Sequence, residues 1–252
     1  MAEEPGRLKM QKQLNAMKKE MTMHMRENAS LRKAIKEISI NDLIKASLLP
    51  RAMNYEDVNI DGLLDGHLQK NIPIKDYVFI ENMKEVAHLA MNCLELSNYL
   101  DRNLLLSSYR ILAEDKTAYF RKNNPVVYDF NHVPPHSFDI DERLDVALKK
   151  IYQPELGDDV VLKAMYIHNK IIEIYPFKEY NAELAIFAMN YFLMENGFMP
   201  IEFPLKRYPY CELTAACIKG RKQEEMYNHL VEAVYTKMAD TIIACRNYGE
   251  KE

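Results

Sequence analysis

The sequence predicts a mainly α-helical protein, and three observations support this fold class. Apolar residues recur at three- and four-residue steps nearly everywhere, which is the period of a helix with one buried face. Seven glycines and no tryptophan argue against a turn-rich all-β sandwich. With 252 residues, 48% apolar and 28% charged, the chain has the composition of a globular protein and the length for one sizeable domain plus an appendage.

The N-terminal segment predicts a long helix, because residues 7–38 contain neither glycine nor proline. Its apolar face is formed by Met10, Leu14, Met17, Met21, Leu31, Ile35 and Ile38. His24 and Asn28 interrupt this face. The helix either packs on its own domain or forms a short coiled coil or partner helix, in which a polar residue would fix the register. We therefore divide the chain into an N-terminal helical extension, residues 1–47, and a main domain, residues 48–252.

The main domain is expected to begin where the helical pattern stops, at Pro50 and the polar stretch 54–66. A second long helix is predicted after Pro73. Its apolar side consists of Ile80, Met83, Ala87, Leu89, Met91 and Leu94. Two shorter helices are predicted over residues 104–112 and 140–152.

Residues 118–140 are the one place where strands are expected. Val126, Tyr128 and Phe130 alternate with Val127 and Asp129, which is the two-residue period of a strand. The prolines that follow residue 133 end any strand pairing. A short β-hairpin that packs on helices is the expected structure.

Two buried helices joined by a short loop are predicted next. Residues 160–174 form the first, and Pro176 ends it because proline disfavours helical backbone in the preceding residue. The second begins after Asn181, a favoured cap residue, and finishes at Gly197. His168 lies on an apolar face of the first helix, where we interpret it as a satisfied core histidine.

The loop between these helices carries the most informative motif, I-Y-P-F-K-E-Y-N-A-E-L-A-I over residues 174–186. It resembles the signature of Fic-family proteins, H-P-F-x-[DE]-G-N-G-R-x-x-R. The matching residues are Pro176, Phe177, Glu179 and Asn181. The replaced positions are Tyr175 at the family histidine, Tyr180 and Ala182 at two glycines, and Glu183 and Ile186 at the two arginines.

The resemblance extends over about residues 50–235 and implies a Fic-like helical bundle with a hairpin flap. The residues that resemble the family's flap are Phe120, Arg121, Val126, Tyr128, His132, Pro134 and Pro135. Upstream, residues 57–62 resemble the family's inhibitory helix, [ST]-x-x-x-E-[GN]. In this segment Asp57 replaces the hydroxyl residue, Asp61 replaces the glutamate and Gly62 matches.

The resemblance also implies an activity, the transfer of a nucleotide monophosphate, most often AMP from ATP, to a protein hydroxyl. In the family the histidine takes the hydroxyl proton, the acidic residue holds a divalent metal, and the loop and arginines hold the phosphates. Tyrosine titrates near 10, so only about one Tyr175 side chain in a thousand would be basic at neutral pH. Glu183 would place negative charge beside a phosphate, a repulsion of roughly 4 kcal/mol at ~4 Å and an effective dielectric of ~20.

These replacements predict a binding or regulatory pseudoenzyme with no cofactor. Ile186 removes the arginine that the inhibitory glutamate grips, which leaves Asp61 with no expected partner. ATP and Mg²⁺, the latter on Glu179, are expected only if activity is retained. The alternative is a divergent nucleotidyl transferase that uses Tyr175, Glu179 and Asn181.

The charge distribution and the cysteine spacing limit the classes of partner and the cellular compartment that we expect. The net charge is −4, yet residues 1–47 hold ten Lys and Arg against six Asp and Glu. We expect a protein partner through the flap or the N-terminal helix, or self-association, and neither nucleic acid nor membrane. The four cysteines have no C-x-x-C spacing and are expected as reduced core thiols. The start M-A-E-E-P-G-R lacks an apolar signal region, so a cytoplasmic protein is expected.

Overall fold

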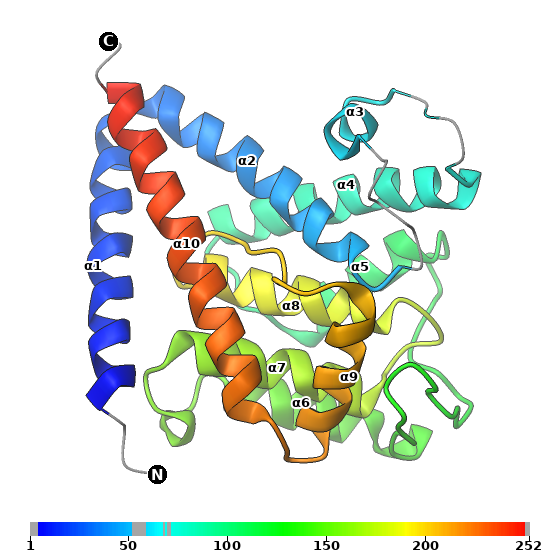
Figure 1. The fold of residues 1–252 in the computed structure, drawn as a ribbon. Helices are drawn as coiled ribbons and strands as arrows, with labels where there is room; N and C mark the ends of the chain where they lie inside the picture. Colours follow the sequence, from blue (N-terminus) through cyan, green and yellow to red (C-terminus); the bar gives the residue numbers. More distant parts are fainter. Residues whose placement is uncertain (1–4, 52–58, 68, 70–71, 250–252) are drawn as a thin grey trace.

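The computed structural model describes residues 5–51, 59–67, 69 and 72–249, and its fold is mainly α-helical, as predicted. The helices are α1 (Pro5–Glu27), α2 (Ala29–Leu48), α3 (Ile60–Leu64), α4 (Ile74–Glu95), α5 (Arg102–Leu112), α6 (Ile140–Lys150), α7 (Val160–Ile174), α8 (Asn181–Glu195), α9 (Arg207–Ile218) and α10 (Gln223–Gly249). Two short 3-10 turns, η2 (Ser137–Asp139) and η3 (Pro154–Leu156), precede α6 and α7. Figure 1 shows α10 running along α1 at one edge, with α7 and α8 in the middle of the bundle.

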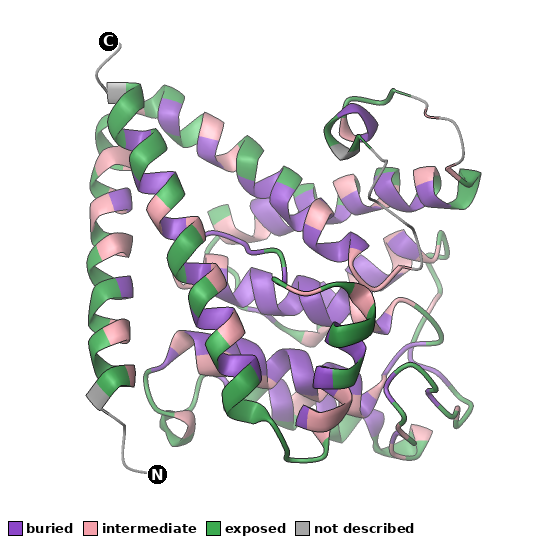
Figure 2. Ribbon diagram, viewed as in Figure 1, coloured by how far each residue is buried: buried purple, intermediate pink, exposed green. Residues whose placement is uncertain are grey.

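Helix α8 is the centre of the core. All residues from 184 to 193 are buried, so this helix is covered on every side. It packs most closely on α7 and also contacts α2, α4 and α5. Figure 2 shows this centre as the most continuous buried part of the ribbon. The loop that joins α7 to α8 is therefore anchored at both ends in the buried centre of the molecule.

The predicted N-terminal helix is two helices, because the chain breaks at Asn28. The Asn28 side-chain oxygen accepts a hydrogen bond from the backbone N–H of Leu31 at 2.8 Å, which caps α2. Helix α1 buries Leu14 and Met21 and packs on α10. Of the two alternatives, the apolar face of α1 thus packs on its own chain. Helix α2 packs on α4 and α8 and contributes to the central core.

The predicted hairpin is reduced to a single antiparallel bridge. Val127 and His132 exchange two backbone hydrogen bonds of 2.8 and 3.1 Å around a turn in which Asn131 has a φ of 44°. No strand is present in the described ranges. The prolines and the left-handed residue confine pairing to this one pair. In the rest of this paper, residues 126–132 are called the flap.

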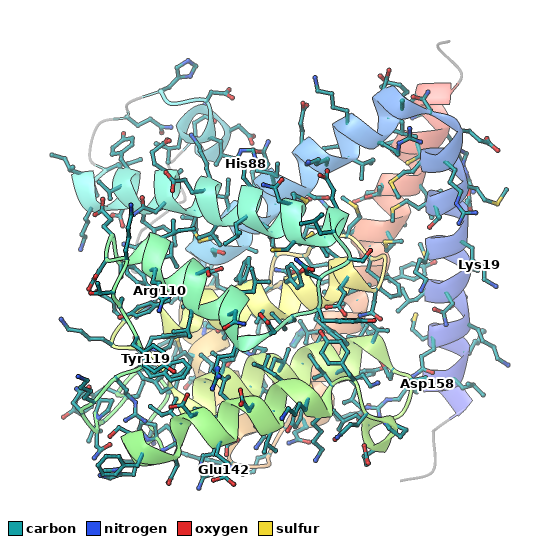
Figure 3. All side chains as sticks on the ribbon, turned by 180° about the vertical axis from the view of Figure 1, so that it is seen from behind. Lys19, His88, Arg110, Tyr119, Glu142 and Asp158 are labelled. Carbon is teal, nitrogen blue, oxygen red and sulfur yellow. The ribbon has the colours of Figure 1, made fainter. Side chains whose placement is uncertain are left out.

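No helix within the described ranges is long and apolar enough to cross a lipid bilayer. The four cysteines carry free thiols, and three of them, Cys211, Cys217 and Cys245, are buried. Figure 3 shows the molecule from behind, with Tyr119 and Arg110 on the side away from α1 and Asp158 on the side near it.

Candidate functional site

The loop between α7 and α8 is bounded by two tyrosines in left-handed backbone conformation. Tyr175 ends α7 with a φ of 50°, and its N–H donates to the Ile171 carbonyl at 2.8 Å. Tyr180 precedes α8 with a φ of 61°. Left-handed backbone costs a non-glycine residue on the order of 1 kcal/mol, so the surrounding contacts must hold the loop in this shape.

Asn181 holds the loop closed from the inside. Its side-chain oxygen accepts from the backbone N–H of Phe177, and its side-chain nitrogen donates to the carbonyl of the same residue, both at 2.9 Å. The prediction that Asn181 caps the helix was wrong: Asn181 is the first residue of α8, and Tyr180 takes the cap position without a side-chain bond. The Asn181 side-chain amide is buried and turns back toward the loop, where both its oxygen and its nitrogen bond backbone groups.

Arg121 holds the same loop from the flap side. Its guanidinium is buried and donates to the carbonyl oxygens of Tyr175 at 2.7 Å and Ile174 at 3.2 Å. The same guanidinium reaches three further acceptors within residues 123–135, and the Arg121 backbone N–H donates to the carbonyl of buried Pro176 at 2.9 Å. The last carbonyls of a helix have no partner within it, so this arginine satisfies the end of α7. Burial lowers the pKa of Arg121.

The flap is held to the body of the protein at His132, Asp129 and buried Phe130, while two of its apolar side chains are exposed. The His132 ring nitrogen Nε2 bonds the carbonyl of Glu173 in the last turn of α7 at 2.7 Å. Asp129 pairs with Arg207 at 2.9 Å. By contrast, Tyr128 is 87% and Val126 53% exposed. The flap therefore presents apolar side chains to solvent from a base that is held in place.

Tyr175 stands where the resemblance places a general base, and its surroundings keep it neutral. Burial raises the pKa of its phenol, and the carboxylates of Glu183 and Asp129 raise it further. Phe177 next in the loop is fully buried and stacks on Tyr109 with ring centres 4.4 Å apart.

Glu183 lies in the first turn of α8 and is held by Arg51, which follows α2. Arg51 approaches the Glu183 carboxylate at 3.5 Å and the buried Asp76 carboxylate at 2.8 and 3.0 Å. Its guanidinium carbon is 4.0 Å from the ring centre of Phe79, on whose ring Tyr180 also stacks. Burial raises the pKa of Glu183, and Arg51 opposes that shift.

The sequence did not indicate Arg51 or Asp76 as members of this site. No motif surrounds either residue, and Arg51 lies 132 positions before Glu183 in the chain. The charge of Glu183 was the one available signal, since a carboxylate in a buried helix needs a cation.

The remaining motif residues offer little to a ligand. Ile186 is fully buried, Ala182 packs half-buried against the core, and Glu179 is exposed. No group of three or more His, Cys, Asp or Glu side chains in the described part of the chain could hold a metal ion.

The segment that resembles an inhibitory helix contacts α2. Asp61 pairs with Lys45 at 2.7 Å, so the expectation that it lacks a partner was wrong. Lys45 is available because α2 passes beside α3, which the sequence pattern could not specify. The Gly62 N–H donates to the Asn59 side chain, and a Cβ on this glycine would meet Asn59 at 2.9 Å. Asp57 lies outside the described residues.

His168 is a core residue, as predicted. It is fully buried, and its two ring nitrogens bond Tyr210 at 2.9 Å and Asn169 at 3.0 Å. Burial lowers its pKa to about 4, so it stays neutral in the physiological range.

Comparison with known proteins gives one family match and several solved structures of the same fold. Residues 99–193 match the model of the family described as Fic/DOC family. A Fic domain containing signaling protein from Bacteroides thetaiotaomicron has a TM-score of 0.73 at 14% identity over 93% of this chain and 97% of its own. Fic-1 from C. elegans, in its E274G form, has a TM-score of 0.66 at 16% identity over 95% and 71%.

A Fic family protein from Desulfovibrio desulfuricans G20 has a TM-score of 0.66 at 15% identity over 95% of this chain and 76% of its own. No curated protein matches the chain. The loop, the flap and the two central helices thus coincide with the matched region, and the chain is a Fic-fold protein whose residues 99–193 match the Fic/DOC family.

Proposed function

We propose that this protein is a Fic-fold pseudoenzyme that acts by binding a protein partner and does not transfer nucleotides. The ion pair between Glu183 and Arg51 is the observation that carries the proposal. The first turn of a helix is a ready anion site, because its N–H groups and dipole favour negative charge. In this protein a carboxylate of the chain itself lies there, with its own cation.

The loop residues do not fit a magnesium nucleotide. A phosphate beside Glu183 would meet a like charge, with roughly 4 kcal/mol of repulsion at ~4 Å and an effective dielectric of ~20. The side chains of Tyr180 and Ala182 occupy positions where glycines would let phosphate approach the backbone. Glu179 is exposed, but Mg²⁺ on one carboxylate needs phosphate oxygens as further ligands.

The loop also lacks a general base. Tyr175 is kept protonated by burial and by its acidic neighbours. Loss of a general base costs on the order of 10² to 10⁴ in rate. Its phenol thus adds to the packing of the loop and not to proton transfer.

The flap supports a binding role. Tyr128 and Val126 are exposed, while His132 and the bridge hold the base of the flap. An extended peptide can add to such an edge through backbone hydrogen bonds, with its side chains against the exposed aromatic ring.

Self-labelling with an α-labelled nucleotide tests whether catalysis is absent. We expect no signal from the full chain with Mg²⁺ or Mn²⁺ and any of the four nucleotides, and no difference in Glu179→Ala. A divergent transferase predicts the opposite, a signal that Glu179→Ala abolishes. That result would overturn the proposal.

Tyr128→Ser tests the binding role, with Tyr99→Ser as the matched control. Tyr99 is 68% exposed and contacts Tyr152 near the C-terminal end of α8, the opposite end from the loop and the flap. Cross-linking and quantitative mass spectrometry of partners should lose the same proteins with the flap variant and retain them with the control. Equal partner profiles for both variants would rule out the flap as the binding surface.

A further inference from the structure

We propose that a second cavity, remote from the loop, binds a small organic anion with an aromatic or apolar body. This inference is independent of the proposed function. The cavity has a volume of about 810 Å³, which lies in the range of small-molecule sites. Its walls come from the start of α1, the end of α6, the turn at η3, the outer face of α7 and the connection from α9 to α10.

Three donor groups line this cavity without an acceptor, and they come from three different helices. The side-chain nitrogen of Gln11 on α1 is buried and has no hydrogen-bond partner. Asn169 on α7 is 9% exposed, and its oxygen is engaged by His168, which leaves its NH₂ group unpaired within the described chain. The Lys150 ammonium on α6 lies 5.6 Å from the Tyr166 ring centre and has no carboxylate partner among the described residues.

Two of the three carboxylates that line the cavity have partners. Glu173 pairs with Lys170 at 2.6 Å. Asp159 accepts from the Leu162 N–H at 3.0 Å and from the Tyr227 hydroxyl at 2.6 Å. Glu155 is exposed, on the turn at η3.

Among the described residues that line the cavity, the Gln11 nitrogen is the one buried donor left without an acceptor, and such a donor is costly, so a ligand oxygen that accepts from it is favoured. The Asn169 NH₂ group and the Lys150 ammonium line the same cavity and supply two further donors. A carboxylate or a phosphate group has this chemistry, and the unpaired ammonium of Lys150 favours a negative charge.

The remaining walls favour an apolar ligand body. Leu156, Leu162, Met165 and Ile218 line the cavity together with Tyr166. The ring of Tyr166 has the ammonium of Lys150 at 5.6 Å and that of Lys170 at 5.8 Å from its centre. An aromatic ring against Tyr166 would bring its acidic group within the reach of both lysines. The fitting ligand is therefore an aryl or alkyl acid, either a carboxylate or a phosphate monoester.

Calorimetry and ligand-observed NMR on the full chain test this assignment. The probes are benzoate and phenyl phosphate, with benzyl alcohol and benzylamine as neutral and cationic counterparts. We expect the anions to bind with a dissociation constant of about 1 mM, a value suited to ligands of this size. The neutral and cationic probes should bind at least about fivefold more weakly. A preference between benzoate and phenyl phosphate identifies the acid group.

Two variants and two matched controls place the binding in this cavity. Lys150→Met should weaken the anions about tenfold, and Gln11→Leu about fivefold, because each removes one donor. Lys149→Met is the control for the first, since Lys149 lines a different cavity. Gln13→Leu, on the exposed side of α1, is the control for the second. Both controls should leave the affinity unchanged.

Several outcomes would overturn the assignment. Absence of binding by both anions at about ten times the expected dissociation constant is one. Binding of benzylamine as tightly as benzoate is another, and equal losses in Lys150→Met and Lys149→Met is a third.

Discussion

The end of α7 and the start of α8 face each other across one short loop, and they differ in what holds them. At the end of α7, Arg121 and His132 bond backbone carbonyls, and at the start of α8, Asn181 bonds the backbone of Phe177. In the same first turn of α8, Glu183 and Arg51 pair through charges.

This difference between backbone hydrogen bonds and an ion pair matches the pattern of signature residues that this chain keeps and replaces. Arg121, Phe177 and Asn181 satisfy backbone groups or fill core space that any loop of this shape would leave open. Positions 175, 183 and 186 are those where the family signature has its histidine and two arginines. In this structure Tyr175 lies near the carboxylates of Glu183 and Asp129, Glu183 pairs with Arg51, and Ile186 is buried in the core.

Arg121→Met should have the largest effect on stability. The change leaves the carbonyls at the end of α7 and three acceptors on Asn123, Asn124 and Pro135 without this donor, at an expected cost of about 3 to 5 kcal/mol in the free energy of unfolding. Denaturant unfolding measures it. Arg143→Met is the control, because Arg143 is about half exposed and its contact with Asp139 is 3.9 Å, so less than about 0.5 kcal/mol is expected. Similar losses in both variants would contradict the role of Arg121.

Arg51→Met should come next, with a loss of about 3 kcal/mol at neutral pH. It leaves the carboxylates of Asp76 and Glu183, whose side chains are 3% and 12% exposed, without their cation. Denaturant unfolding of Arg51→Met and of Arg51→Met/Glu183→Gln measures this, since the second change should restore part of the stability. An identical stability for the single and double variants would show that Arg51 acts through Asp76 alone.

Asn181→Ala should cost about 2 to 3 kcal/mol, because it leaves the N–H and the carbonyl of Phe177 unpaired in a buried place. Asn181→Asp keeps the acceptor but places a buried carboxylate oxygen against the Phe177 carbonyl, so it should be at least as destabilising as the alanine variant. Thermal unfolding ranks the three proteins. A stable alanine variant would mean that the stacking of Phe177 on Tyr109 suffices to hold the loop.

The helices on either side of the loop could be predicted from sequence, because residues next to each boundary determine where the helix begins or ends. Asp159 caps α7 through the Leu162 N–H, and Pro176 stops it, so both boundaries are set by neighbouring residues. The break at Asn28 was missed, because nothing in the apolar spacing distinguishes one long helix from two that turn onto different partners. Two ion pairs between distant parts of the chain were also missed, because a local pattern does not show which helices pack together. They are Arg51 with Glu183 and Lys45 with Asp61.

Glu183→Gln should have the smallest effect and the most informative pH dependence. Burial raises the pKa of Glu183 above its unfolded value, so its contribution to stability is present below the unfolded pKa and lost as pH rises through the folded pKa. At pH 7 the glutamine variant should thus be as stable as the wild type, or more stable by up to about 1 kcal/mol, and any gain should vanish below about pH 4. Unfolding of both proteins across this range measures it. A glutamine variant that is less stable at pH 7 would mean that the pair with Arg51 outweighs the cost of burying the Glu183 carboxylate. In that case the ion pair stabilises the first turn of α8, as hydrogen bonds stabilise the end of α7.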